Sequence, residues 1–335
     1  MLRIGIPRTL AYFIYYPFWK VFFTELGHEV VLSSPTTRDI MDKGVKEAVN
    51  DACIPIKIYH GHVADLIGKA DYIFCPRMVS VRKHGDFGTE TFCPKFLGLP
   101  DMIRLGIKNL PPLLDVRIDL KKGKNELKNV CLQVGHDLGN ENSDIVKAMQ
   151  SGLKVQKKYQ KCLTRGIFPE EAMDMVLNHK EEQVYTSNPE FTIAVVGYPY
   201  TIYDPYINVG LIRILQKENV KVVTQDMLND HQLNRMAKTL PKSLFWYFSN
   251  RAVYGALNFL ERNNIDGIIH ITAFACGPDS MVDRLLEIET HRRSKLPYMS
   301  IMIDEQTGEA GIQTRIEAFI DMLRYRKGGE EYYEN

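Results

Sequence analysis

Apolar and polar positions along this chain alternate between two periods. Short apolar runs that end at turn residues predict buried strands, and the first half holds LRIGIP at 2–7, HEVVLS at 28–33 and ADYIFCP at 70–76. Segments with helical spacing lie between and after them, at 18–26, 39–49 and 55–67. PPLLDVRID at 111–119 and NVCLQVG at 129–135 predict two more strands, while residues 77–100 are irregular.

The same alternation restarts in the second half. FTIAVVGYP, VKVVTQD, DGIIHITAF and PYMSIMID predict strands, with helices expected near 206–217, 251–263, 280–292 and 311–324. Residues 142–184 are charged and helical, as in a connector. Strand–helix alternation with apolar strands is typical of parallel sheets covered on both faces. The pattern therefore predicts an α/β chain of two tandem, doubly wound domains, 1–185 with the connector and 186–335, with a site in the cleft between them.

Composition excludes several classes of protein. The 335 residues include 42 basic and 41 acidic side chains, so a net charge of +1 leaves no footprint for nucleic acid or an anionic membrane surface. The most apolar stretch, TLAYFIYYPFWKVFF, is interrupted by Pro17 and Lys20 and predicts a buried helix rather than a membrane span. We expect a cytoplasmic protein that binds neither nucleic acid nor membrane.

Six cysteines are spread along the chain without any C-x-x-C pair, which favours reduced thiols over a disulfide framework. Cys131 falls in a predicted strand, Cys162 on a charged helix and Cys75 in an apolar pattern, so these three are interpreted as structural. Cys53, Cys93 and Cys276 differ, because each lies in a segment between predicted elements, with a proline one or two residues later. By spacing alone they are either three unrelated buried thiols or one site assembled from distant segments.

Polar residues after the predicted strands are secondary candidates, because ligands of open parallel sheets bind at the carboxyl ends of the strands. They comprise the tyrosines, Asp204 and Asn208 of YPYTIYDPYIN, Glu305 and Glu309 of DEQTGEAG, and His60 and His62. Capping or structural roles are the alternative for each. Arg8, Arg77, Arg82, Lys83 and Lys95 predict a basic first-half side of the cleft, unless they are solvated surface residues.

Six stretches resemble the activase-related family of the 2-hydroxyacyl-CoA dehydratase superfamily. They are IGIPRTLAYFIYYPFWKVFF, DACIPIKIYHGHV, CPKFLGLPD, GYPYTIYDPYIN, ITAFACGPDS and DEQTGEAGIQTRIEAFID, in the family's order from residue 4 to 321. The resemblance implies two flavodoxin-like (Rossmann-like) domains with a [4Fe–4S] cluster between them, bound by Cys53, Cys93 and Cys276. Relatives with a double-cubane [8Fe–9S] cluster supply an alternative in which Cys75 is a further ligand.

The resemblance also implies a function. Members of the superfamily receive low-potential electrons from an ATP-hydrolysing activator, and the absence of a phosphate-binding loop in this chain implies that the activator is a separate protein. We therefore expect electron transfer or reduction, acting on an acyl-CoA or another small substrate. The alternative is a non-enzymatic, cluster-bearing scaffold or electron-carrier subunit. In either case, a second copy of the chain or a related subunit is a possible partner.

Overall fold

The computed structural model describes residues 1–82, 90–182 and 188–333. The first half contains a four-stranded sheet with the order β2-β1-β3-β5, and all three strand pairs are parallel. Its strands are β1 (Arg3–Ile6), β2 (Glu29–Leu32), β3 (Tyr72–Phe74) and β5 (Leu113–Leu114). A small parallel pair, β4 (Arg77–Ser80) with β6 (Arg117–Asp119), continues this half of the fold.

Helices of the first half pack in two groups. Helix α1 (Tyr12–Glu25) packs along α7 (Asn142–Thr164), and α2 (Arg38–Glu47) packs along α3 (Ile54–Leu66). The aromatic side chains of α1 are buried around Pro17, which confirms the buried helix expected there. None of the helices in the described ranges combines the length and apolarity that a membrane crossing requires.

The second half repeats the arrangement. Its four strands are parallel in the order β10-β9-β7-β8, with the bounds β7 (Phe191–Gly197), β8 (Val220–Thr224), β9 (Gly267–Ala273) and β10 (Tyr298–Ile303). Apolar residues of α12 (Tyr247–Arg262) and α13 (Gly277–Arg293) join Ile268 of β9 in one core cluster. Those of α10 (Leu211–Lys217) and α14 (Glu309–Tyr333) join Ile269 from the opposite sheet face.

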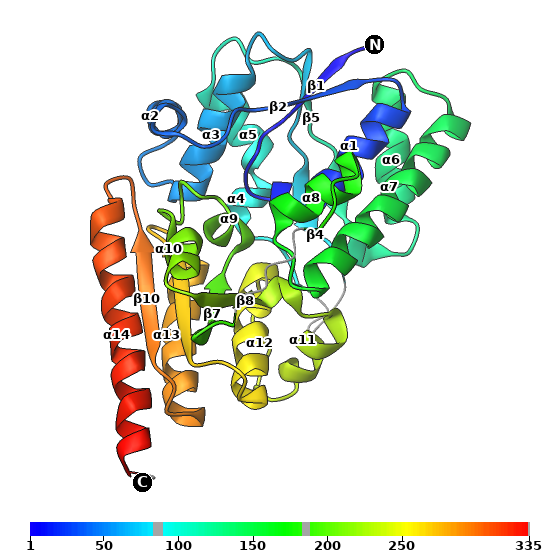
Figure 1. Cartoon of the computed structure of the whole chain (residues 1–335). Coiled ribbons are helices and arrows are strands. Elements are labelled where there is room, and N and C mark those ends of the chain that lie inside the picture. The colour runs from blue at the N-terminus through cyan, green and yellow to red at the C-terminus, as the bar shows by residue number, and fades with distance from the viewer. Residues whose placement is uncertain (83–89, 183–187, 334–335) are drawn as a thin grey trace.

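Numbered within its own half, each sheet has the strand order 2-1-3-4. The order reverses between the first and third strands, β1 and β3 in one half and β7 and β9 in the other. This is the doubly wound topology, in which the crevice at the reversal is the usual ligand position. The predicted fold of two α/β units is confirmed, and Figure 1 shows the first-half sheet above the second-half sheet.

Two sequence-based assignments were wrong. NVCLQVG lies in helix α6 (Glu126–Asp137), where Val130, Cys131 and Val134 are buried at helical spacing. A short apolar run does not distinguish a strand from a buried helix. The stretch 77–100, expected to be irregular, contains β4, α4 (Pro94–Leu97) and the start of α5 (Leu99–Gly106).

The connector is helical as predicted, through α7 and α8 (Pro169–Asn178), but α7 packs on α1 and is part of the first half. The predicted domain boundary at 185/186 lies outside the described residues. The remaining elements are short: η1 (Leu120–Lys122), α9 (Pro199–Ile202), η2 (Gln225–Met227) and α11 (Asp230–Ala237).

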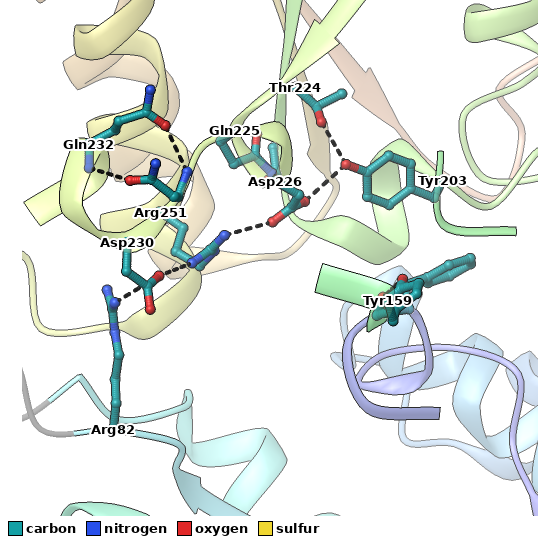
Figure 2. Close-up of polar contacts among 12 residues, drawn as sticks. Arg82, Tyr159, Tyr203, Thr224, Gln225, Asp226, Asp230, Gln232 and Arg251 are labelled. Carbon is teal, nitrogen blue, oxygen red and sulfur yellow. Dashed lines mark hydrogen bonds and ion pairs between the residues drawn. The ribbon is translucent and has the colours of Figure 1, made fainter. Parts of the chain in front are cut away.

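Polar contacts join the two halves. Lys57 of α3 pairs with Glu305, which follows β10, at 2.6 Å. Figure 2 shows a second link, in which Asp230 accepts from Arg82 of the first half and from Arg251 of α12. Arg251 also pairs with Asp226 at 3.1 Å. Asp226 in turn accepts a hydrogen bond from the hydroxyl of Tyr203, which follows β7 and α9. These contacts and a continuous apolar core hold the halves together.

Candidate functional site

The three proline-associated cysteines have the same local structure. Cys53, Cys93 and Cys276 are the N-cap residues of α3, α4 and α13, and each of these helices has a proline at its first or second position. Proline suits this position because its fixed φ matches the helix and its missing N–H has no partner there anyway. Helix α13 therefore begins at Gly277, three residues earlier than expected.

The fold brings these three thiols into one electrostatic neighbourhood. Burial raises the pKa of Cys276 well above its usual value, and Asp279, Cys53 and Cys93 raise it further. Burial is also the main cause of the raised pKa of Cys93, to which Cys53 adds. Two thiols come from the first half and one from the second, so the site forms only when both halves are in place.

Helix amides and one lysine oppose the effect of burial. No side chain caps these helix starts through a hydrogen bond. The backbone amide of the third helical residue nevertheless lowers the pKa of the cysteine before it: Ile56 for Cys53, Phe96 for Cys93 and Asp279 for Cys276. Lys95 lowers the pKa of both first-half thiols. Desolvation still dominates, so the free thiols stay protonated at neutral pH.

This donor set suits a soft metal centre. Three cysteine sulfurs at helix N-termini, two of them largely buried, match the thiolate preference of iron–sulfur clusters. The described residues contain no group of three or more His, Cys, Asp or Glu side chains close enough to hold a single metal ion. The fit to an iron–sulfur cluster rests on the chemistry of the donors, three cysteine sulfurs.

Aromatic rings from both halves pack against one another next to Cys93 in the chain. Phe92 and Phe96 flank Cys93 in sequence, and their centroids lie 5.2 and 5.9 Å from Phe248 of α12. The backbone N–H of Tyr247 donates to the carbonyl of Thr91 at 2.9 Å, which holds the halves in register here. The phenylalanines were missed by the sequence analysis, although their spacing around Cys93 is a usable signal. We call the six rings the aromatic shell; its members are Phe92, Phe96, Tyr198, Tyr200, Tyr247 and Phe248.

The other cysteines have different environments. Cys75 is fully buried at the end of β3, and burial raises its pKa to about 12. Tyr59 and the charges of Asp115 and Arg104 contribute to that pKa. Cys131 is buried in α6, with a pKa raised to about 12 by desolvation, and Cys162 lies on α7. These surroundings are those of apolar packing.

Several secondary candidates have structural partners. Asp204 accepts from the N–H groups of Tyr206 and Ile207 and so caps a turn, because α10 opens only at Leu211. Asn208 donates to the carbonyl of Ile202 at 2.7 Å. Glu309 pairs with Arg213, His60 Nδ1 bonds the carbonyl of Ile56, and His62 lies between two hydroxyl groups.

The predicted basic wall is largely neutralised. Arg8 pairs with Glu170 at 2.7 Å, Arg77 with Asp101 at 2.7 Å, and Arg82 with Glu90 and Asp230. Lys95 contacts the carbonyl of Asp51 and lies beside the thiols. Lys83 is outside the described residues.

A cavity of about 950 Å³ lies between the halves and is bordered by Ile54, the residue after Cys53. Three basic side chains line it, Arg38, Lys180 and Arg213. The seven carboxylates that line it are Glu170, Glu171, Asp174, Glu181, Asp304, Glu305 and Glu309. This lining repels a polyanion and is compatible with a small neutral molecule.

These features define an α/β protein with two four-stranded parallel sheets, whose candidate site takes cysteines from both halves. The chain belongs to the family of the CoA enzyme activase uncharacterised domain, whose sequence signature matches residues 3–228. Residues 168–323 also match the 2-hydroxyglutaryl-CoA dehydratase, D-component. No curated protein matches the chain. The expected relationship to the dehydratase superfamily is confirmed, and the chain resembles a component of a dehydratase-like system.

Proposed function

We propose that Cys53, Cys93 and Cys276 hold a [4Fe–4S] cluster and that the chain is the electron-accepting, reducing component of a dehydratase-like system. The observation that carries this proposal is that three cysteines, two from the first half and one from the second, are each the N-cap residue of a helix and affect one another's pKa. A bound [4Fe–4S] cluster supplies one-electron chemistry, and three protein ligands leave one iron with an open position.

The chain's own residues have defined roles in this proposal. The amides at the starts of α3, α4 and α13, together with Lys95, stabilise the thiolates against the cost of burial. The aromatic shell excludes water and lowers the local polarity, which is one determinant of a cluster's reduction potential. A separate ATP-hydrolysing activator is the proposed electron donor, in keeping with the activase and dehydratase-component signatures.

The substrate is proposed to be a small molecule that enters from the acidic cavity. Its seven carboxylates against three basic groups disfavour the phosphates of a whole acyl-CoA and favour an uncharged reducible compound. Saturation kinetics distinguish an enzyme from the alternative of an electron carrier or scaffold. A carrier reduces its partner stoichiometrically and shows no saturable turnover of a small molecule.

The first test is the iron and acid-labile sulfide content of anaerobically purified protein, with an electron paramagnetic resonance (EPR) spectrum. We expect about four irons per chain, lost in Cys53→Ser, Cys93→Ser and Cys276→Ser. Cys131→Ser and Cys162→Ser are matched controls that retain the iron. About eight irons, with dependence on Cys75, would instead identify the double-cubane cluster. No iron after anaerobic reconstitution contradicts the proposal.

A further inference from the structure

Helix α7 carries a row of exposed lysines without acidic partners. The row, which we call the lysine face, consists of Lys154, Lys157, Lys158 and Lys161. Their spacing of i, i+3, i+4 and i+7 places them on one side of the helix over about 10 Å. No acidic residue occurs between residues 145 and 165, and these lysines form no ion pair with any described residue. The basic residues on either side are paired, Lys147 with Asp144 and Arg165 with Glu182.

Other helices of this protein balance their surface charges. Helices α2, α13 and α14 each pair basic with acidic side chains three or four residues apart. In α7, like charges stand four residues apart at Lys154 and Lys158 and again at Lys157 and Lys161, which destabilises a helix. The helix dipole favours cations only in the last turn, so it offsets the repulsion at Lys161 alone. The local fold therefore does not account for the lysine face.

The opposite face of α7 is buried against α1. Gln156 Nε2 donates to the carbonyl of Ile14 at 2.8 Å. The Tyr159 hydroxyl donates to the carbonyl of Phe13 at 2.5 Å. Helix α1 also packs against α9, the short helix that carries Tyr200 of the aromatic shell, and Figure 1 shows α7 beside α6 at the outer edge of the first half. One helix thus lies between α7 and the segment that carries Tyr200.

The composition of the lysine face favours an acidic protein surface as its partner. The face has no arginine and no exposed aromatic ring, the side chains that grip phosphates in a bidentate manner or stack on bases. Leu153, 42% exposed next to Lys154, is a single apolar side chain, too few for a helix that inserts into a membrane surface. Lysines around a small apolar contact match the charged rim of a weak protein interface.

We propose that the lysine face docks an acidic surface of the protein that delivers electrons to this chain. The inference rests on the proposed function, which needs a separate electron donor, and it names where and by what chemistry that donor binds. Exposed lysines steer an acidic partner into contact and raise the association rate more than they raise the affinity. A partner that must leave after each electron transfer is suited to such a surface, because weak redox complexes have small interfaces.

The test measures binding of a fluorescein-labelled poly-glutamate peptide by fluorescence anisotropy, with the whole chain at physiological ionic strength. Replacing all four lysines of the lysine face with glutamine should weaken binding at least about tenfold. The matched control loses the same charge at four exposed, unpaired lysines elsewhere and should stay within about twofold of wild type; its positions are Lys46, Lys108, Lys217 and Lys221. Replacing the lysine face with arginine keeps the charge and should keep the binding.

Three outcomes overturn the lysine face as a docking site. They are no binding of the peptide to wild type, equal weakening in both glutamine variants, and loss of binding in the arginine variant, which decides if the glutamine variant fails to fold. Stronger displacement of the peptide by a DNA duplex of equal charge, or by phosphatidylserine vesicles, also overturns it and identifies a nucleic-acid or membrane surface. Iron content of the same samples tests the proposed function separately, because peptide binding does not require the cluster.

Discussion

A buried series of hydrogen bonds between the two halves predicts how the free energy of unfolding depends on pH. The backbone N–H of Arg8 donates to Ser33 Oγ, which lies 2.9 Å from His62 Nδ1. His62 Nε2 lies 3.0 Å from Thr36 Oγ1, and the Thr36 hydroxyl donates to Asp204 of the second half. Because Thr36 donates to the carboxylate, it accepts from His62, and the imidazole is neutral with its proton on Nε2.

His62 and Asp204, the two titrating groups of this hydrogen-bond series, have opposite effects on the free energy of unfolding as the pH changes. Burial lowers the pKa of His62 to about 4, so its contribution to stability is complete above its unfolded pKa of 6.5 and is lost as the pH falls toward 4. Burial raises the pKa of Asp204 from 3.8 to about 6, so its contribution is complete below pH 3.8 and is lost as the pH rises through 6. At roughly 1.4 kcal/mol per pH unit, each effect is at most about 3 kcal/mol. Between about pH 4 and pH 6 they largely cancel.

A single substitution at Asp204 or at His62 should reveal the contribution of each group separately. Asp204→Asn is neutral at every pH, so relative to wild type its free energy of unfolding should rise by up to about 3 kcal/mol between pH 4 and pH 6. His62→Gln should show the reverse, gaining on wild type as the pH falls from 6.5 to 4. A constant offset is expected in each variant from altered hydrogen bonds, so the slope with pH is the diagnostic quantity.

The assay is urea unfolding followed by circular dichroism across this pH range, with wild type and variants compared at each pH. The comparison cancels contributions from all other ionisable groups. Charged groups near the chain, Arg8, Asp65 and Glu170, are common to all three proteins. A difference from wild type that does not change with pH in either variant would refute the reasoning.

Three further predictions concern packing and charge, and unfolding free energy is the measurement for each. Gly44→Ala should lower the free energy of unfolding by about 1–3 kcal/mol, because the added Cβ would lie 1.9 Å from the carbonyl oxygen of Lys57. Gly123→Ala is the control and should leave it unchanged, because a Cβ at Gly123 would have no atom within 4 Å. Lys57→Met should lower the free energy of unfolding by about 1–2 kcal/mol, because it breaks the ion pair with Glu305. Adding Glu305→Gln should recover part of that loss. If the losses of the two single variants simply add in the double variant, the ion pair is contradicted. Arg251→Met should cost about 3–5 kcal/mol, since it removes the cationic partner of Asp226, whose side chain is 11% exposed. The hydroxyl of Tyr203 still donates to Asp226 in the variant, and a loss below about 1 kcal/mol would contradict the prediction.

Local patterns predicted most of the strands. The apolar runs that end in turn residues correspond to β1, β2, β3 and all four strands of the second sheet. The sequence analysis singled out Cys53, Cys93 and Cys276 by the proline shortly after each, and the structure places a helix start at each position, including the one at Cys93 in a stretch expected to be irregular. These features are local, since strand period, helix capping and proline geometry depend on neighbouring residues only.

Periodicity failed where a segment was short. The run around Cys131 was interpreted as a strand and is a helix, because four or five apolar residues satisfy either pattern when the contacts that bury them are unknown. The four members of the aromatic shell outside YPYTIYDPYIN were missed for a related reason. Phe92 and Phe248 are far apart in sequence, and nothing local to either one indicates the other.

By itself the sequence determined the α/β class, the repeated strand–helix pattern and which three cysteines are followed closely by a proline. Only the tertiary structure decided that thiols separated by 40 and 183 residues share one neighbourhood and that the arginines of the first half are paired. The physical reason is that strand order and the packing of the two halves bring these groups together, and both depend on contacts between distant segments. Burial, which dominates the chemistry of every thiol here, exists only in the folded chain.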